Sequence, residues 1–191
     1  MKYKNYFYFT KTSFEERRFL KIINQNTSIL DYGCGEGVWS SSVAKKIYLY
    51  DKNKKLIPFL KNKYSKNNFY ILKKPIFNKE VFLSNSVIQY IDDKNLYSLK
   101  KKIIDKFNII IFSDIPKYPR IIEGIISILF NPQRLLLALY YFFNHEYRKF
   151  GFYYRSFDKI VSVLDKYYNF QVIKNLTEEK ITRYTIVFKK K

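Results

Sequence analysis

The sequence contains one cysteine, Cys34, and one histidine, His145, among its 191 residues. A structural zinc site needs about four such ligands and a disulfide needs two thiols, so neither can stabilise this fold. A lone thiol fits a reducing compartment. We therefore expect no metal centre, and we interpret Cys34 as a small loop residue.

Acidic residues are also scarce: 16 Asp and Glu stand against 36 Lys and Arg, which leaves a formal net charge of +20. Such a charge is typical of proteins that bind nucleic acid or an anionic membrane surface. The lysines are scattered in short clusters, however, and Lys, Ile, Asn, Tyr and Phe are abundant together, as A/T-rich codons would produce. The charge by itself therefore does not identify a polyanionic partner.

The chain lacks a long unbroken apolar run. Its most apolar region, residues 121–143, is interrupted by Glu123, Arg134 and the Asn131–Pro132 pair. A membrane-spanning helix needs about 18 to 20 nearly unbroken apolar residues, so this region is not expected to span. The first residues lack the apolar core of a signal peptide. We expect a cytoplasmic protein, and peripheral membrane contact stays open.

Short apolar runs alternate with polar segments of helical length in the first two thirds of the chain. Such runs are typical of strands buried on both faces, and the alternation predicts a parallel sheet with right-handed helical crossovers. The predicted strands cover residues 28–32, 47–51, 69–72, 81–85 and 107–114, and the predicted helices cover residues 38–46, 54–66 and 93–106.

The two ends of the chain follow other patterns. A capping box at residues 13–16 predicts a helix over residues 13–24. Near the C-terminus, helical spacing of apolar residues covers 156–167, and two strands at 170–174 and 184–190 are close enough in sequence to pair in antiparallel fashion. The length suits one well-buried domain.

Glycine is rare as well, with five in the chain, yet Gly33, Gly35 and Gly37 stand at alternate positions directly after the first apolar run. A glycine turn between a strand and a helix lets a ligand approach the backbone and leaves peptide amides open to it. The Gly-Lys-Ser/Thr ending of a Walker loop is missing, and Val38 stands where a dinucleotide fingerprint needs glycine.

Two acids accompany the loop. Asp31 precedes the first glycine, and Asp51 ends the next apolar run, where a carboxylate can accept both hydroxyls of a ribose. The extra acid suits a cationic ligand. A different nucleotide, or a turn that serves packing alone, stays open as an alternative.

The stretch ILDYGCGEG, followed by LYD, resembles the first two motifs of the class I S-adenosylmethionine-dependent methyltransferases. In that family the loop cradles the cofactor, the first acid lies near its amino acid part and the second binds its ribose. The resemblance continues in LSNSVIQYI (83–91) and IIIFSDIP (109–116), is weaker over residues 152–173 and is absent over 117–151. It implies an α/β, Rossmann-like, mostly parallel seven-stranded sheet with helices on both faces and an antiparallel C-terminal strand.

The resemblance also implies S-adenosylmethionine as the cofactor. The family often has an acid near the adenine after its third strand, whereas this chain reads ILKKP, so Leu72 is assigned by position alone. The cofactor-binding residues implied are Asp31, Gly33, Cys34, Gly35, Gly37, Asp51, Lys52, Leu72 and Asn85.

We interpret residues 1–191 as a single methyltransferase-like domain. Residues 1–27 form an N-terminal helical segment, and residues 117–151 form an apolar helical insertion after the fifth strand, which caps the acceptor pocket, contacts a membrane, or is an ordinary core element. The oligomeric state stays open.

The sequence identifies the methyl acceptor less clearly than it identifies the cofactor. The family's base-nitrogen enzymes have a D/N-P-P-Y/F/W turn after the fourth strand, where this chain has Ser84-Asn85-Ser86-Val87. This disfavours nucleic acid. We expect methyl transfer to a small-molecule, sugar or lipid-linked acceptor, with O-methylation favoured. An RNA methyltransferase, a basic nucleic-acid-binding protein or a catalytically silent partner subunit are the alternatives.

The candidate catalytic residues are His145, Tyr90 and Asp114. A histidine near neutrality suits a general base for a hydroxyl. Tyr90 and Asp114 follow the predicted fourth and fifth strands, so we expect them at the pocket edge. Arg155 is a weaker candidate for pairing with an acidic substrate.

Overall fold

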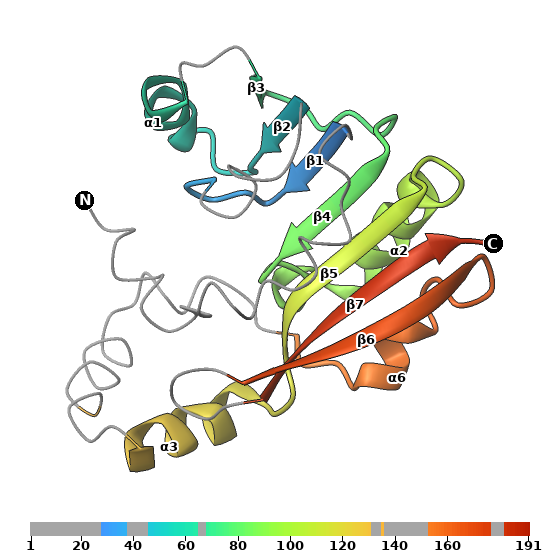
Figure 1. Ribbon diagram of the computed structural model, residues 1–191. Coiled ribbons are helices and arrows are strands. Elements are labelled where there is room, and N and C mark those ends of the chain that lie inside the picture. Colours follow the sequence, from blue (N-terminus) through green and yellow to red (C-terminus); the bar gives the residue numbers. More distant parts are fainter. Residues whose placement is uncertain (1–27, 38–45, 65–67, 131–134, 136–152, 177–181) are drawn as a thin grey trace.

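The computed structural model describes residues 28–37, 46–64, 68–130, 135, 153–176 and 182–191. Seven strands form one sheet in the order β3-β2-β1-β4-β5-β7-β6 (Figure 1). The strands are β1 (Ser28–Tyr32), β2 (Lys46–Tyr50), β3 (Phe69–Leu72), β4 (Val81–Asn85), β5 (Ile109–Pro116), β6 (Tyr168–Leu176) and β7 (Thr182–Lys190).

The pairing confirms the expected mostly parallel sheet. Strands β1 to β5 pair in parallel, while β7 runs antiparallel to both of its neighbours, β5 and β6. The last strand of the chain is therefore inserted between β5 and β6, and β6 forms the edge of the sheet. The predicted antiparallel pair near the C-terminus is confirmed, and both strands are longer than predicted.

Strand limits follow the apolar runs closely. β1, β3 and β4 have the predicted limits, and β2 begins one residue earlier than predicted. β5 runs over Ile109–Pro116 instead of 107–114, because β7 pairs with it as far as Pro116, opposite Arg183. Phe107 lies before the strand and is buried in the core instead.

Helices cover both faces of the sheet, as predicted. Helix α1 (Leu56–Lys63) packs on one face, where Leu60 joins Ile47 and Leu49 in a buried cluster. It is shorter than the predicted 54–66. Pro58 is the third residue of α1, in the first turn, where a backbone amide has no partner within the helix.

Helices α2 (Asp93–Ile103) and α6 (Phe157–Val161) pack on the opposite face. The side chain of Ser156 caps α6 by accepting from the Lys159 amide. The prediction of a helix over 156–167 is correct only for its first part, because the chain continues as turns after Val161. Two further elements are the 3-10 turn η4 (Ile88–Tyr90) and helix α3 (Arg120–Phe130).

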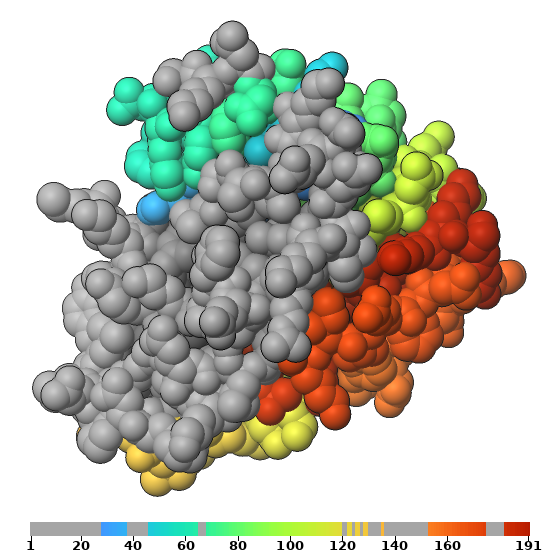
Figure 2. Space-filling model, in the orientation of Figure 1, coloured from blue at the N-terminus to red at the C-terminus, as the bar shows by residue number. Residues whose placement is uncertain are grey.

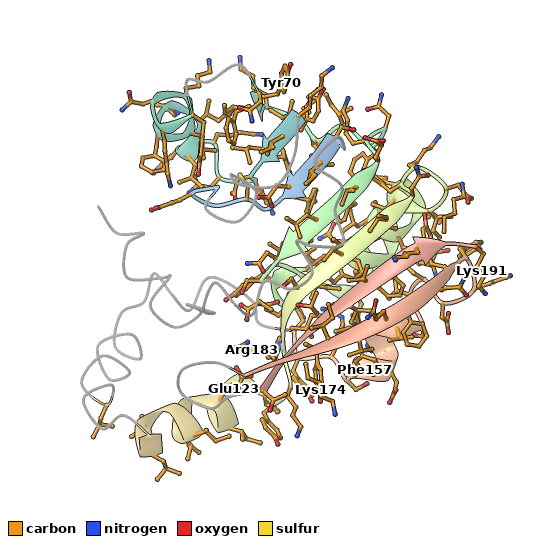
Figure 3. All side chains as sticks on the ribbon, viewed as in Figure 1. Tyr70, Glu123, Phe157, Lys174, Arg183 and Lys191 are labelled. Atoms are coloured by element: carbon orange, nitrogen blue, oxygen red, sulfur yellow. The ribbon has the colours of Figure 1, made fainter. Side chains whose placement is uncertain are left out.

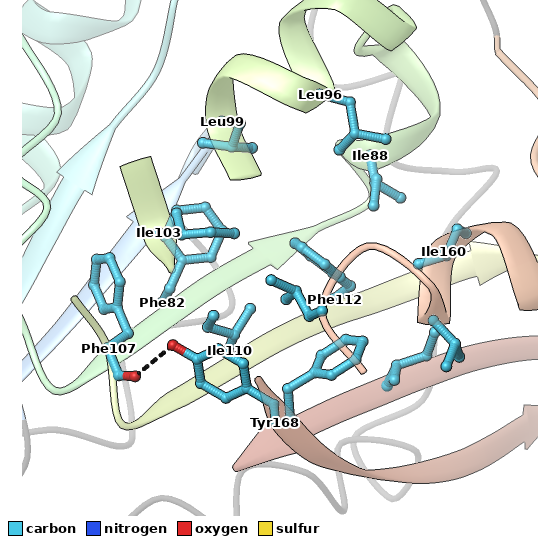
Figure 4. Close-up of a cluster of buried hydrophobic side chains, with 14 of the residues drawn as sticks. Phe82, Ile88, Leu96, Leu99, Ile103, Phe107, Ile110, Phe112, Ile160 and Tyr168 are labelled. Carbon is cyan, nitrogen blue, oxygen red and sulfur yellow. Dashed lines mark hydrogen bonds between the residues drawn. The ribbon is translucent and has the colours of Figure 1, made fainter. Parts of the chain in front are cut away.

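The largest core lies between the sheet and helices α2 and α6 (Figure 4). Phe82 packs edge-on against Phe107 and Phe112, with ring centroids 5.3 and 6.3 Å apart. The hydroxyl of Tyr168 donates to the Phe107 carbonyl at 3.0 Å, so this buried phenol keeps a hydrogen bond. Burial of these rings holds β4 and β5 rigidly beside β1, which fixes the edge where the glycine loop begins.

The predicted helix at 13–24, most of that at 38–46 and much of residues 117–151 lie outside the described residues. The described part of the 117–151 insertion includes α3. Within the described part of the chain, every helix is too short or too polar to cross a bilayer.

Candidate cofactor site at the glycine loop

The glycine loop leaves β1 at the carboxyl edge of the sheet and has backbone angles that favour glycine. Gly33, Gly35 and Gly37 have φ values of 77°, 53° and 70°. A Cβ atom on Gly33 would lie 2.5 Å from Cγ2 of Val87, and one on Gly37 would lie 2.8 Å from Cε2 of Tyr64. Conformation and close packing therefore both require glycine at these two positions.

The peptide amides of the loop are bonded within the protein. The Gly33 and Cys34 amides donate to the Tyr50 carbonyl at 2.7 and 3.0 Å, and the Gly37 amide donates to the Cys34 carbonyl at 2.8 Å. The expectation that the loop leaves these amides open to a ligand is wrong, because the end of β2 and the loop itself satisfy them.

Asp51 faces the loop. Its Oδ2 accepts from the Gly35 amide at 3.0 Å, and its Oδ1 accepts from the Asn53 amide at 2.7 Å. The residue is half-buried, and each carboxylate oxygen can accept a further hydrogen bond. Asp31 is only 1% exposed at the end of β1, paired in register with Leu49, two residues before Asp51. The structure thus brings the two predicted acids and the glycine loop together.

The surroundings of the loop are acidic although the chain is strongly basic. Burial raises the pKa of the Cys34 thiol, and the charges of Asp31 and Asp51 raise it further. Burial, together with Asp31, Cys34 and Glu36, raises the pKa of Tyr64 to about 12. Burial disfavours a charge of either sign, but the carboxylates of Asp31, Asp51 and Glu36 around the loop favour a cation over an anion. The donor set therefore fits a ligand that carries a sulfonium and an ammonium group.

The remaining predicted cofactor residues lie along the same edge of the sheet. Leu72 ends β3 opposite Tyr50 and packs partly against the main core. Asn85 ends β4 and is half-buried, and Lys52 is exposed beside Asp51. Their roles toward a cofactor stay predictions.

Asp114 does not lie where we expected it. It is within β5, in a bulge where Ser113 and Asp114 oppose the single residue Thr185. Its φ is 56° and it is only 2% exposed, so it is not at an open pocket edge. The hydroxyl of Ser86, which itself has a φ of 58°, donates to Asp114 Oδ2. Bulges and left-handed residues of this kind re-aim side chains and are common next to active sites.

A buried ion network surrounds Asp114. Arg183 on β7 lies 2.9 Å from Glu123 on α3 and 3.7 Å from Asp114 (Figure 3). Burial raises the pKa of Glu123 to about 7 and raises that of Asp114, while the Arg183 charge acts against both shifts. Sequence reasoning missed this network. The one signal for it was an acid, Glu123, within an otherwise apolar run.

The Arg155 side chain connects the segment before α6 to η4 and to the start of α2. Its Nη1 donates to the Ile88 carbonyl at 3.0 Å, and its Nη2 donates to the Ile91 carbonyl at 2.6 Å. Its Nε and Nη2 also donate to Asp93, at 3.0 and 2.7 Å. The interpretation of Arg155 as a partner for an acidic substrate is therefore replaced by a structural role.

Two catalytic candidates remain, Tyr90 and His145. Tyr90 is half-buried in η4. His145 lies outside the described residues. Both stay predictions.

The fold is that of the class I S-adenosylmethionine-dependent methyltransferases, as comparison with solved structures shows. TehB from Haemophilus influenzae aligns over 99% of this chain and 66% of its own, with a TM-score of 0.62 and 17% identity. The chain thus spans just under two thirds of TehB. The N-methyltransferase NodS from Bradyrhizobium japonicum WM9 aligns over 92% and 94%, with a TM-score of 0.62 and 9% identity.

A third similar structure is the methyltransferase domain of bacterial CtHen1, which aligns over 85% of this chain and 89% of its own, with a TM-score of 0.58 and 17% identity. The sequence itself matches no family model and no curated protein. At these identities the likeness establishes the fold, and the chemistry has to be argued from the site.

Proposed function

We propose that this protein transfers a methyl group from S-adenosylmethionine to an acceptor. The observation that carries the proposal is the position of Asp51, whose carboxylate accepts from the Gly35 amide of the glycine loop, with a second acid, Asp31, close by. When bound, the cofactor supplies an electrophilic methyl group on a sulfonium.

Different residues would bind the ribose and the cationic part of that cofactor. Asp51 would accept the ribose hydroxyls, since it directly follows β2 and its oxygens retain capacity for further hydrogen bonds. Asp31 and Glu36 contribute negative charge beside the cationic part. Methyl transfer is a displacement in line, so the main task of the protein is alignment and the exclusion of water.

For the acceptor we propose a small-molecule, sugar or lipid-linked hydroxyl. O-methylation needs a group that takes the hydroxyl proton. The Ser86–Asp114 pair supports this chemistry, because the half-buried Ser86 hydroxyl, which donates to the buried Asp114 carboxylate, would pass the acceptor's proton on to it. The pair is near the loop, since Val87, the next residue, packs against Gly33.

RNA is the second candidate acceptor. The similar solved structures include the methyltransferase domain of CtHen1 and a Pnkp1/Rnl/Hen1 complex described as an RNA repair complex. The net charge of +20 is compatible with a phosphate backbone. Retention on immobilised RNA over a salt gradient tests this candidate, and elution at low salt would remove it.

The cofactor proposal is tested by the thermal shift that adenosylhomocysteine causes. We expect a rise in melting temperature at millimolar ligand, largely lost in Asp51→Asn, whose amide cannot accept as many hydrogen bonds. Asp165→Asn is the matched control, because it removes the same charge from an exposed position on the turn after α6. Absence of any shift in the wild-type protein, or an equal shift in all three proteins, contradicts the assigned role.

A further inference from the structure

In helix α3 the acid is buried, whereas three of its apolar side chains are exposed. Glu123 is 6% exposed, whereas Ile122, Ile125 and Leu129 are 44%, 54% and 74% exposed. These three positions are spaced by three and four residues, so they share one face of the helix. We call this face the α3 stripe. A helix on the surface of a globular protein normally shows the reverse arrangement.

The buried ion pair keeps the helix in this orientation. Arg183 Nη2 lies 2.9 Å from Glu123 Oε2, and both side chains are only 8% exposed. Turning the α3 stripe inward would break this pair and leave a buried charge without compensation. Figure 3 shows Glu123 beside Arg183 where α3 meets β7, and Figure 2 shows α3 in yellow on the lower surface of the molecule.

Positive charge accompanies the α3 stripe. In sequence, residues 117–151 carry five basic and two acidic side chains. One of the two acids, Glu123, is already paired with Arg183. Exposed Lys174 on β6 lies next to Asn175, which pairs in register with Arg183. An apolar face with the exposed Lys174 nearby, on a chain of net charge +20, complements the surface of an anionic bilayer.

We propose that the α3 stripe docks on the surface of an anionic membrane. The helix has 11 residues, too few to span a bilayer, so it lies in the plane of the interface with Ile122, Ile125 and Leu129 among the acyl chains. This inference does not depend on methyl transfer. If the proposed function holds as well, Glu123 and Arg183 connect the docked helix to Asp114 at the acceptor side of the sheet.

The test is flotation of the full chain with phosphatidylcholine vesicles that do or do not contain one quarter phosphatidylglycerol. We expect binding to the anionic vesicles and weaker binding to the neutral ones. Leu129→Glu should reduce partitioning at least about tenfold, because a charge replaces an exposed apolar side chain that would insert among the acyl chains. Tyr97→Glu, which makes the same charge change at a 60% exposed aromatic on α2, should change partitioning less than about threefold.

Three outcomes would overturn the proposal. The first is no binding of the wild-type chain to anionic vesicles. The second is an equal reduction in both variants, which would mean that net charge alone drives binding. The third is a dimer in light scattering that Leu129→Glu dissociates without any vesicle binding, which would assign the α3 stripe to a second copy of this chain. Ile125→Glu repeats the test at a second position, and circular dichroism confirms that each variant is folded.

Discussion

Gly33→Ala should lower the free energy of unfolding by about 2–5 kcal/mol. One part of this loss comes from the backbone, because φ is 77° and the left-handed region costs a residue with a Cβ about 1–2 kcal/mol. The other part comes from packing. The new Cβ would lie 2.5 and 3.0 Å from the two γ-carbons of Val87. Overpacking of this kind costs about 1–3 kcal/mol, and valine cannot rotate away easily.

A double-mutant cycle separates the two parts. Val87→Ala removes both γ-carbons from a half-buried side chain and should by itself cost about 1 kcal/mol. In that background both γ-carbons are gone and the nearest remaining Val87 atom is its Cβ at 3.3 Å, so Gly33→Ala should cost little more than the backbone part, about 1–2 kcal/mol. The coupling between the two sites is then about 1–3 kcal/mol in favour of the double variant.

The measurement is urea unfolding of the four proteins followed by circular dichroism, with slopes that agree between variants. An unchanged cost of Gly33→Ala in the Val87→Ala background would refute the reasoning, because the glycine would then be required by backbone conformation alone. It would also place Val87 away from the glycine loop and weaken the link between the loop and the Ser86–Asp114 pair.

Three further predictions concern stability. The pKa of Glu123 is raised to about 7 from 4.5, so the folded protein holds a proton that the unfolded chain loses, and stability should fall as pH rises through this window, by at most about 1.4 kcal/mol per pH unit. Urea unfolding at pH 5 and pH 8 should show a smaller decrease for Glu123→Gln, and identical decreases would contradict the burial of this carboxyl. Arg155→Lys should cost about 2 kcal/mol, since one ammonium cannot replace a fork that reaches two carbonyls, whereas Lys159→Arg at an exposed ion pair should leave the melting temperature nearly unchanged. Equal effects would contradict this connecting role of Arg155. Phe82→Ala should cost about 3–5 kcal/mol and Phe170→Ala, at a 46% exposed ring, much less, as denaturant midpoints would show.

The positions of candidate site residues were predicted correctly where they depend on local sequence, whereas those that depend on contacts with distant strands were not. Asp31, Asp51 and the three glycines could be assigned because Asp31 is near the end of β1, the glycines come after β1 and Asp51 comes directly after β2, and the ends of parallel strands meet at one edge. Asp114 was misplaced because a bulge in β5 is set by pairing with β7, which lies far away in sequence. The satisfied loop amides were missed for a similar reason, since the Tyr50 carbonyl that accepts them belongs to another strand.

The sequence by itself determined the strands, the parallel class of the sheet and the position of the glycine loop. Short segments rich in apolar residues and the backbone freedom of glycine are local properties, so they can be recognised without knowledge of tertiary contacts. Only the tertiary structure decided that β7 enters between β5 and β6, that Arg183 joins Glu123 and Asp114, and that α3 exposes its apolar face. These features depend on contacts between side chains that are far apart in sequence. A buried charge needs a compensating charge, and here that charge lies on a different helix or strand.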